Sequence, residues 1–213
     1  MRSRLARIAG TFLVAAGLGL VAAAVVVAPA GAAEAPVGLG TASSFAVLAG
    51  TTVTNTGSSV ITGNVGVSPG TAITGFPPGT VNGTFHRNDA AAIQAQSDVT
   101  IAYNDAAGRA PTQSGMANLT GMTLVSGVYS GAAGLSLNGS GVLTLNGQGD
   151  PNAVFIFQAG STFISGSSSV VRLTNSAQAC NVYWKVGSSA TLGTNSVLVG
   201  TVLALTSVTA NTG

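Results

Sequence analysis

Threonine recurs in this sequence at intervals that would place its side chains in rows. Thr191 and Thr209 stand one repeat apart in ATLGTN and SVTANTG, and each is followed three residues later by another threonine, Thr194 or Thr212. A similar string, TVTNTG, begins at Thr52. Because threonine is β-branched and restricted at χ1, a row of outward threonines presents hydroxyls and methyls at fixed positions. Such a surface could hold water molecules in a regular array.

The row is predicted to contain Thr54, Thr191 and Thr209, with Thr162 or Ser136 extending it. Side chains alternate between the two faces of a strand, so inward Val208 and Ala210 would place Thr209 and Asn211 outward. A second row, at the corners, would contain Thr56, Thr194 and Thr212. The candidate residues for the water-ordering surface are therefore Thr54, Thr56, Thr162, Thr191, Thr194, Thr209, Asn211 and Thr212. The alternative is that threonine fills exposed strand positions because of its high strand propensity.

Residues suited to acid–base, nucleophilic or metal chemistry are few and scattered. Cys180, the one cysteine, is expected to be buried at the start of a strand, and a reactive thiol is the alternative. His86 has no second His or Cys to complete a metal site and is interpreted as structural or solvent-exposed. Asp150, before Pro151, fits a turn. We therefore expect no catalytic residue, no metal and no cofactor, and the protein is not expected to be an enzyme.

The first 33 residues are predicted to be a signal peptide. Arg2, Arg4 and Arg7 precede an apolar run over 8–28, and small residues follow in APAGAAEAP. Cleavage is expected near Ala32 or Ala33, which would make the protein secreted. A retained membrane anchor is the alternative, because the apolar run approaches spanning length. The remaining residues, 34–213, are expected to form one domain.

The predicted mature chain is close to neutral. Three of the seven basic residues lie in the predicted signal, which leaves Arg87, Arg109, Arg172 and Lys185 against four aspartates and Glu34. Charged residues make up 6% of the chain, whereas about a quarter is usual. No basic patch could neutralise phosphates, so nucleic acid is an unexpected partner. The surface is predicted to be polar but uncharged.

Short apolar segments separated by glycine predict many short strands, and these repeat in three-strand units. The segment 154–173 aligns with 182–200 as three strands and two Gly/Ser corners, and 45–67 and 128–146 fit the same frame. A unit of roughly 20 residues is typical of one coil of a three-sided solenoid. An antiparallel sandwich is the alternative, but its strands have no reason to resemble one another at that period.

One helix is predicted over about 88–108, which lacks internal Gly and Pro. Asn88 or Asp89 would cap its start and Gly108 would end it. Its apolar stripe is predicted to contain Ala92, Ile93, Val99, Ala102 and Ala106, with Tyr103 at the margin. These small residues suit close packing on a sheet. The helix is expected to cover the side that contains FIFQ and YWKV, because those strands are apolar on both faces.

Of the other two sides, one resembles an ordinary exterior with Arg172, and the other is rich in Thr, Ser and Asn. The uncharged Thr side suits a repeating lattice of water such as an ice plane, since charged groups would hold hydration shells of their own. Long strings support the same interpretation. LGTASSFAVLAGTTVTNTG, DAAAIQAQSDVTIAYNDAAGR, GQGDPNAVFIFQAGST and NVYWKVGSSATLGTNSVLVGTVLALTSV closely resemble the microbial ice-binding (antifreeze) protein family. The resemblance covers nearly all of 37–213.

The resemblance implies a mainly β, irregular three-sided right-handed β-solenoid with one long α-helix packed along one side, inserted after the first coil. It also implies a secreted protein whose partner is the surface of an ice crystal and which inhibits ice growth or recrystallisation. Thr209–Thr212 (TANT) matches the Thr-Ala/Gly-x-Thr/Asn pattern of some members, and Thr191–Thr194 (TLGT) matches in its two threonines. The alternative function is a cell-surface or matrix adhesion solenoid without ice activity.

Members of this family typically continue past the equivalent of TANTG. We therefore expect that the sequence is a fragment or lacks its closing coil. We also expect a monomer that makes no membrane contact after signal cleavage, although an absent coil would leave an unpaired strand edge that favours association.

Overall fold

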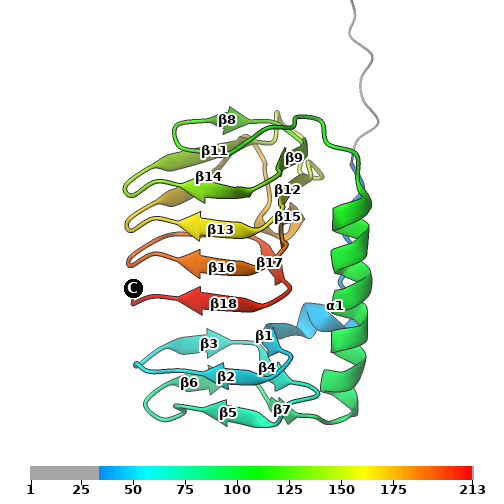
Figure 1. Ribbon diagram of the computed structural model, residues 1–213, viewed down its shortest axis with the longest axis vertical. Helices are drawn as coiled ribbons and strands as arrows, with labels where there is room; N and C mark the ends of the chain where they lie inside the picture. Colours follow the sequence, from blue (N-terminus) through cyan, green and yellow to red (C-terminus); the bar gives the residue numbers. More distant parts are fainter. Residues whose placement is uncertain (1–33, 213) are drawn as a thin grey trace, which may run out of the picture. The chain divides into compact units, whose positions relative to one another are not determined.

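Eighteen short strands wind around three sides of a β-solenoid in the computed structural model, which describes residues 34–212 (Figure 1). The predicted signal segment 1–33 lies outside the described residues. Every strand pairs in parallel with strands of adjacent coils, never with its neighbour in sequence. Parallel pairing of this kind confirms the predicted solenoid and excludes the antiparallel sandwich.

Each side contains an N-terminal block and a C-terminal block of strands. Side one contains β1 (Phe45–Ala49), β4 (Asn64–Val67) and β7 (Phe85–Arg87), then β9 (Gly127–Gly131), β12 (Phe155–Ala159), β15 (Val182–Val186) and β17 (Thr201–Ala204). Side two contains β2 (Thr52–Thr54) and β5 (Ala72–Thr74), then β10 (Gly134–Leu137), β13 (Thr162–Ser165), β16 (Ser189–Leu192) and β18 (Ser207–Ala210). Side three contains β3 (Val60–Thr62) and β6 (Thr80–Asn82), then β8 (Thr123–Leu124), β11 (Val142–Asn146) and β14 (Val170–Thr174).

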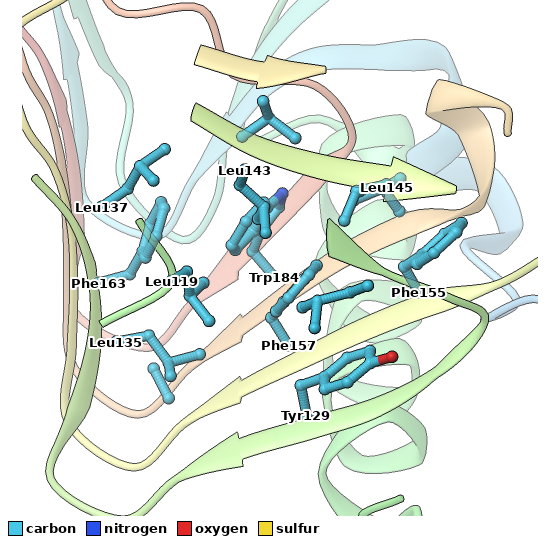
Figure 2. Close-up of a cluster of buried hydrophobic side chains, with 14 of the residues drawn as sticks. Leu119, Tyr129, Leu135, Leu137, Leu143, Leu145, Phe155, Phe157, Phe163 and Trp184 are labelled. Atoms are coloured by element: carbon cyan, nitrogen blue, oxygen red, sulfur yellow. The ribbon is translucent and has the colours of Figure 1, made fainter. Parts of the chain in front are cut away.

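Inward side chains of the C-terminal block form the main core (Figure 2). Tyr129, Phe157 and Trp184 are register partners in β9, β12 and β15, and consecutive rings stack with centroids 5.6 Å and 4.2 Å apart. Phe163 approaches Trp184 from side two at 4.5 Å. The indole Nε1 of Trp184 donates to the carbonyl oxygen of Val199 at 2.9 Å, so its buried polar group is satisfied. These four rings, which we name the aromatic column, fill the core between side one and side two.

Glycine at the corners lets one coil lie directly against the next. A Cβ at Gly160 would overlap the carbonyl oxygen of Ala132, and a Cβ at Gly187 would overlap that of Gly160. Any side chain at these two corners would separate the coils. This explains why Gly punctuates the strands at the coil period.

Side one is covered by α1 (Ala90–Gly108), the single α-helix of the described residues. Asp89 caps its start by accepting from the backbone N–H of Ala92 at 2.9 Å, and its last residue is Gly108. The predicted cap and the predicted end are thus both confirmed. Ala102 and Ala106 pack on Ile156 and Tyr183, so the doubly apolar strands are buried as predicted. No helix in the part of the chain that the structure describes is long and apolar enough to span a membrane.

Two predictions about this helix are wrong. Ile93 is 53% exposed, and the buried position next to Ala92 belongs to Ala95 instead, because only alanine lets the helix backbone lie that close to its neighbours. The helix also begins after β7, when two full coils have formed, rather than after the first coil.

The segment before β1 ties the helix to the solenoid. Asp98 accepts from both the backbone N–H and the hydroxyl of Thr41 at 2.7 Å, and from Gln94 Nε2 at 2.9 Å. These hydrogen bonds, led by the Thr41 hydroxyl, lower the pKa of Asp98. At the other end of the helix, Arg109 pairs with Asp105 at 2.9 Å and with Glu34 at 3.1 Å. The helix is thus anchored at its middle and at its C-terminus.

Cys180 corrects another expectation. It lies exposed in the 3-10 turn Ala179–Asn181, just before β15, rather than buried in the strand. The buried position at the start of β15 is taken by Val182, because the chain turns a corner between the two residues.

Truncation of the aromatic column should strongly destabilise the domain. The change Phe157→Ala removes a ring that is 0% exposed and in contact with two others, so we expect a loss of about 3–5 kcal/mol in the free energy of unfolding. Urea unfolding followed by far-UV circular dichroism measures it. The control Ile93→Ala, on the exposed face of α1, should change the value by less than about 0.5 kcal/mol; a similar cost for both variants would contradict the assigned core.

The Asp98–Thr41 contact should make stability depend on pH. Since folding lowers the pKa of Asp98, its contribution is complete above the ordinary aspartate pKa and is lost as the pH falls through the lower folded value. We expect wild type to be more stable than Asp98→Asn at neutral pH and the difference to shrink in acid. Thermal melts of both proteins across the acid range measure this difference; a gap that is constant with pH would refute the linkage.

Candidate functional site

Side two aligns its outward side chains into rows that run across the strands. In the C-terminal block one row contains Ser136, Ile164, Thr191 and Thr209, which are consecutive register partners in β10, β13, β16 and β18. The predicted pairing of Thr191 with Thr209 therefore corresponds to adjacent strands. Hydrogen-bonded strands lie about 4.8 Å apart, so the groups of the row share that spacing. We name this row the threonine row.

A second row lies two residues earlier along the same strands. It contains Gly134, Thr162, Ser189 and Ser207. Thr162 thus shares the outward face with Thr191 but belongs to this neighbouring row, whereas Ser136 belongs to the threonine row itself. The Ser207 hydroxyl donates to Ser189 Oγ at 3.0 Å, which fixes both hydroxyls. Alternate residues on a strand are about 6.6 Å apart, so the two rows form a two-dimensional grid.

The N-terminal block repeats the pattern on side two. Thr54 pairs with Thr74, and Thr52 pairs with Ala72; all four side chains are exposed. Thr74 was missed in the sequence because its string, TAIT, lacks the asparagine that follows Thr54. The apolar alternation around Ile73, which is 9% exposed, was the available signal.

The remaining candidates lie at the corner that follows side two. Thr194 and Thr212 follow β16 and β18, and the backbone N–H of Asn195 donates to the carbonyl oxygen of Thr212 at 3.0 Å. Thr56 follows β2 in the same way, and Asn211 continues β18 with its N–H bonded to the Leu192 carbonyl oxygen at 3.0 Å. All four side chains are exposed. They extend the face at its edge, outside the strands.

A groove of about 590 Å³ separates the two blocks on side two. Its walls include Thr52 and Thr54 from β2 and Thr209 from β18, the two strands whose facing edges are unpaired within residues 34–212. Val208 is the register partner of fully buried Ala190 and so points inward as predicted, yet it is 52% exposed because no described coil lies beneath it. The water-facing surface of side two is therefore divided into two patches.

The other sides differ from side two in charge and cover. On side three, Thr144 in β11 lies between Thr123 and Arg172, so a cation interrupts its threonines. On side one, Lys185 lies over the ring of Tyr103 at 5.1 Å, and the helix covers the strands. Outward positions of side two carry no charged residue among the strands of the described chain. Side two thus differs from sides one and three in having neither a covering helix nor an outward charge on its described strands.

His86, Asp89 and Asp150, which lie outside side two, make structural contacts. His86 Nδ1 lies 2.8 Å from Asp89 Oδ2 at the start of α1, and the N–H of Ala92, followed by His86, lowers the pKa of Asp89. Asp150 accepts from the N–H of Asn152 at 2.8 Å, as expected for a turn. Within residues 34–212, no group of three or more His, Cys, Asp or Glu side chains could hold a metal ion.

The sequence matches known proteins over most of its length. Residues 47–213 match the model of the family described as Ice-binding-like. A protein of Nostoc sp. (strain HG1) named ice-binding protein is 52% identical over 177 residues, which cover 82% of this chain and 64% of that protein. Ice-binding protein 1 of Shewanella frigidimarina is 34% identical over 207 residues, which cover 82% of this chain and 23% of that protein. The chain therefore spans less than two thirds of the length of these two relatives.

Solved structures of ice-binding proteins also match the fold of this chain. A crystal structure of an ice-binding protein from an Antarctic biological consortium matches with a TM-score of 0.83 at 47% identity, covering 85% of this chain and 82% of that chain. The ice-binding protein of Antarctomyces psychrotrophicus matches with a TM-score of 0.78 at 41% identity, covering 83% and 95%.

Proposed function

The chain belongs to the ice-binding-like family, and from that premise we propose that it adsorbs to ice through side two and inhibits ice growth or recrystallisation. The observation that carries the proposal is the register of Thr191 with Thr209 and of Thr54 with Thr74. Both pairs lie on the one uncovered side whose strands have no outward charge. Sides one and three fail one or the other of these two conditions.

The proposed mechanism rests on the grid of hydroxyls and methyls. The β-branched side chain of each outward threonine is restricted at χ1, so less entropy is lost when its hydroxyl binds a lattice water than for a flexible side chain. The methyls are poorly hydrated and order the waters between them. The pairing of the strands prevents the grid from distorting. An adsorbed protein then forces the ice front to grow around it.

The absence of charge supports adsorption to ice rather than to an ionic partner. A charged side chain on the face would keep its own hydration shell, and stripping water from that charge costs free energy. Neither nucleic acid nor a metal ion is proposed as a partner, and no enzymatic activity is proposed. The partner is the ice crystal surface, and the adsorbing species is a monomer.

We propose further that the protein is exported and that cleavage near Ala32 or Ala33 releases the domain 34–213. The basic start, the apolar run and the small residues of 1–33 support this. Just after the predicted site, Arg109 Nη1 donates to Glu34 at 3.1 Å. The carbonyl oxygen of Ala35 accepts from the same guanidinium. Cleavage at the predicted site would leave this anchor intact.

Bulky substitutions on side two should abolish ice adsorption. The double variant Thr191→Tyr/Thr209→Tyr places two large rings on the grid, and we expect ice recrystallisation inhibition to require a roughly tenfold or higher protein concentration, the equivalent of about 1.4 kcal/mol or more. Ice recrystallisation inhibition and thermal hysteresis are both measured on purified protein that contains residues 34–213.

The matched control is Thr144→Tyr, an outward mid-strand threonine of the same block on side three. It should retain wild-type activity, and all three proteins should show the same β-rich circular dichroism. Full activity in the double variant would refute side two as the adsorbing face. A folded wild-type protein with no activity would refute ice binding and favour adhesion.

Export can be tested separately. Expression of the full chain in a bacterial host with a general secretory pathway should yield an extracytoplasmic protein whose N-terminus, read by mass spectrometry, follows Ala32 or Ala33. Replacing both alanines with Tyr should block processing, because signal cleavage requires small residues at the site. An uncleaved wild-type chain held in the membrane would instead support the alternative, in which the apolar run is a retained membrane anchor.

A further inference from the structure

We propose that Ile164 is the residue that limits the adsorbing surface of the C-terminal block, because it interrupts the hydroxyls of the threonine row. The inference rests on the proposed function, since it concerns how well side two matches ice. It adds a residue that the sequence did not single out among the candidates.

The register places Ile164 inside the row rather than at its edge. Ile164 pairs with Ser136 in β10 on one side and with Thr191 in β16 on the other, and Thr209 follows in β18. Its side chain is 50% exposed, so it faces water with its neighbours. One position of the row therefore lacks a hydroxyl while both flanking positions have one.

The core does not explain the isoleucine. Phe163 and Ser165, its neighbours in β13, point inward and are 0% and 2% exposed. The ring centroids of Phe163 and Trp184 lie 4.5 Å apart, and Ser165 Oγ lies 2.9 Å from the buried Ser169 Oγ. The inward contacts of β13 are thus made by other residues, and Ile164 can be changed without opening a cavity.

Isoleucine and threonine differ on such a grid in a defined way. Both branch at Cβ and carry a methyl there, so the methyl row continues through Ile164. The second branch is a hydroxyl in threonine but an ethyl group in isoleucine. A lattice water above Ile164 consequently loses a hydrogen-bond partner.

The variant Ile164→Thr tests the proposal as a gain of function. It would join the hydroxyls of Ser136, Thr191 and Thr209 into one uninterrupted row. One additional matched hydrogen bond corresponds to a roughly two- to tenfold lower protein concentration for the same ice recrystallisation inhibition. A gain of this kind cannot result from misfolding.

Two further variants identify the cause. Ile164→Val shortens the side chain without adding a hydroxyl, so it should stay close to wild type. Val60→Thr adds a hydroxyl at a 69% exposed strand position on side three and should also stay close to wild type. Thermal melts of all variants should coincide, since neither substituted side chain is buried.

The outcomes separate this inference from the function on which it rests. Wild-type activity with a gain only in Ile164→Thr supports it. Wild-type activity with no gain in Ile164→Thr overturns it, as does an equal gain in Ile164→Val, which would assign the effect to side-chain height. Inactive wild-type protein would overturn the proposed function and this inference together, whereas the other three results leave the function in place.

Discussion

The parallel pairing of strands from adjacent coils is the constraint on which the structure depends. Backbone hydrogen bonds hold neighbouring strands at about 4.8 Å, whatever their side chains. Equivalent positions of successive coils must therefore lie in line, both inside and outside. The stacked rings of Tyr129, Phe157 and Trp184 and the row that contains Thr191 and Thr209 result from the same register. The same strand register therefore determines both the packing of the core and the spacing of the outward side chains on side two.

The helix adds a second constraint. It contacts β1 and β7 in the N-terminal block and β12 and β15 in the C-terminal block. Buried alanines permit this close approach, and the hydrogen bonds from Thr41 to Asp98 anchor the middle of the helix. The helix thus connects the N-terminal and C-terminal blocks along side one and leaves side two uncovered.

Much of this could be predicted from the sequence, because repetition is visible in letters. The paired threonines, the helix bounds and the buried strands with FIFQ and YWKV followed from periodicity, capping and hydrophobicity. Ile93, Cys180 and the exposure of Val208 could not be predicted, since each depends on which surface lies opposite. The place of Ile164 was equally hidden: coils differ in length, so its alignment with Thr191 is a property of the pairing and not of a fixed spacing.

The lack of charge on side two matters in the salty liquid that surrounds growing ice. A growing crystal excludes salt, so the ionic strength of the remaining solution rises as freezing proceeds. Coulombic contacts weaken under those conditions because the Debye length falls from about 10 Å at 0.1 M to about 3 Å at 1 M. A face built from hydroxyls and methyls offers nothing for the salt to screen. The proposed adsorption through side two would therefore be preserved in concentrated brine, whereas screening would weaken the contacts of a charged surface.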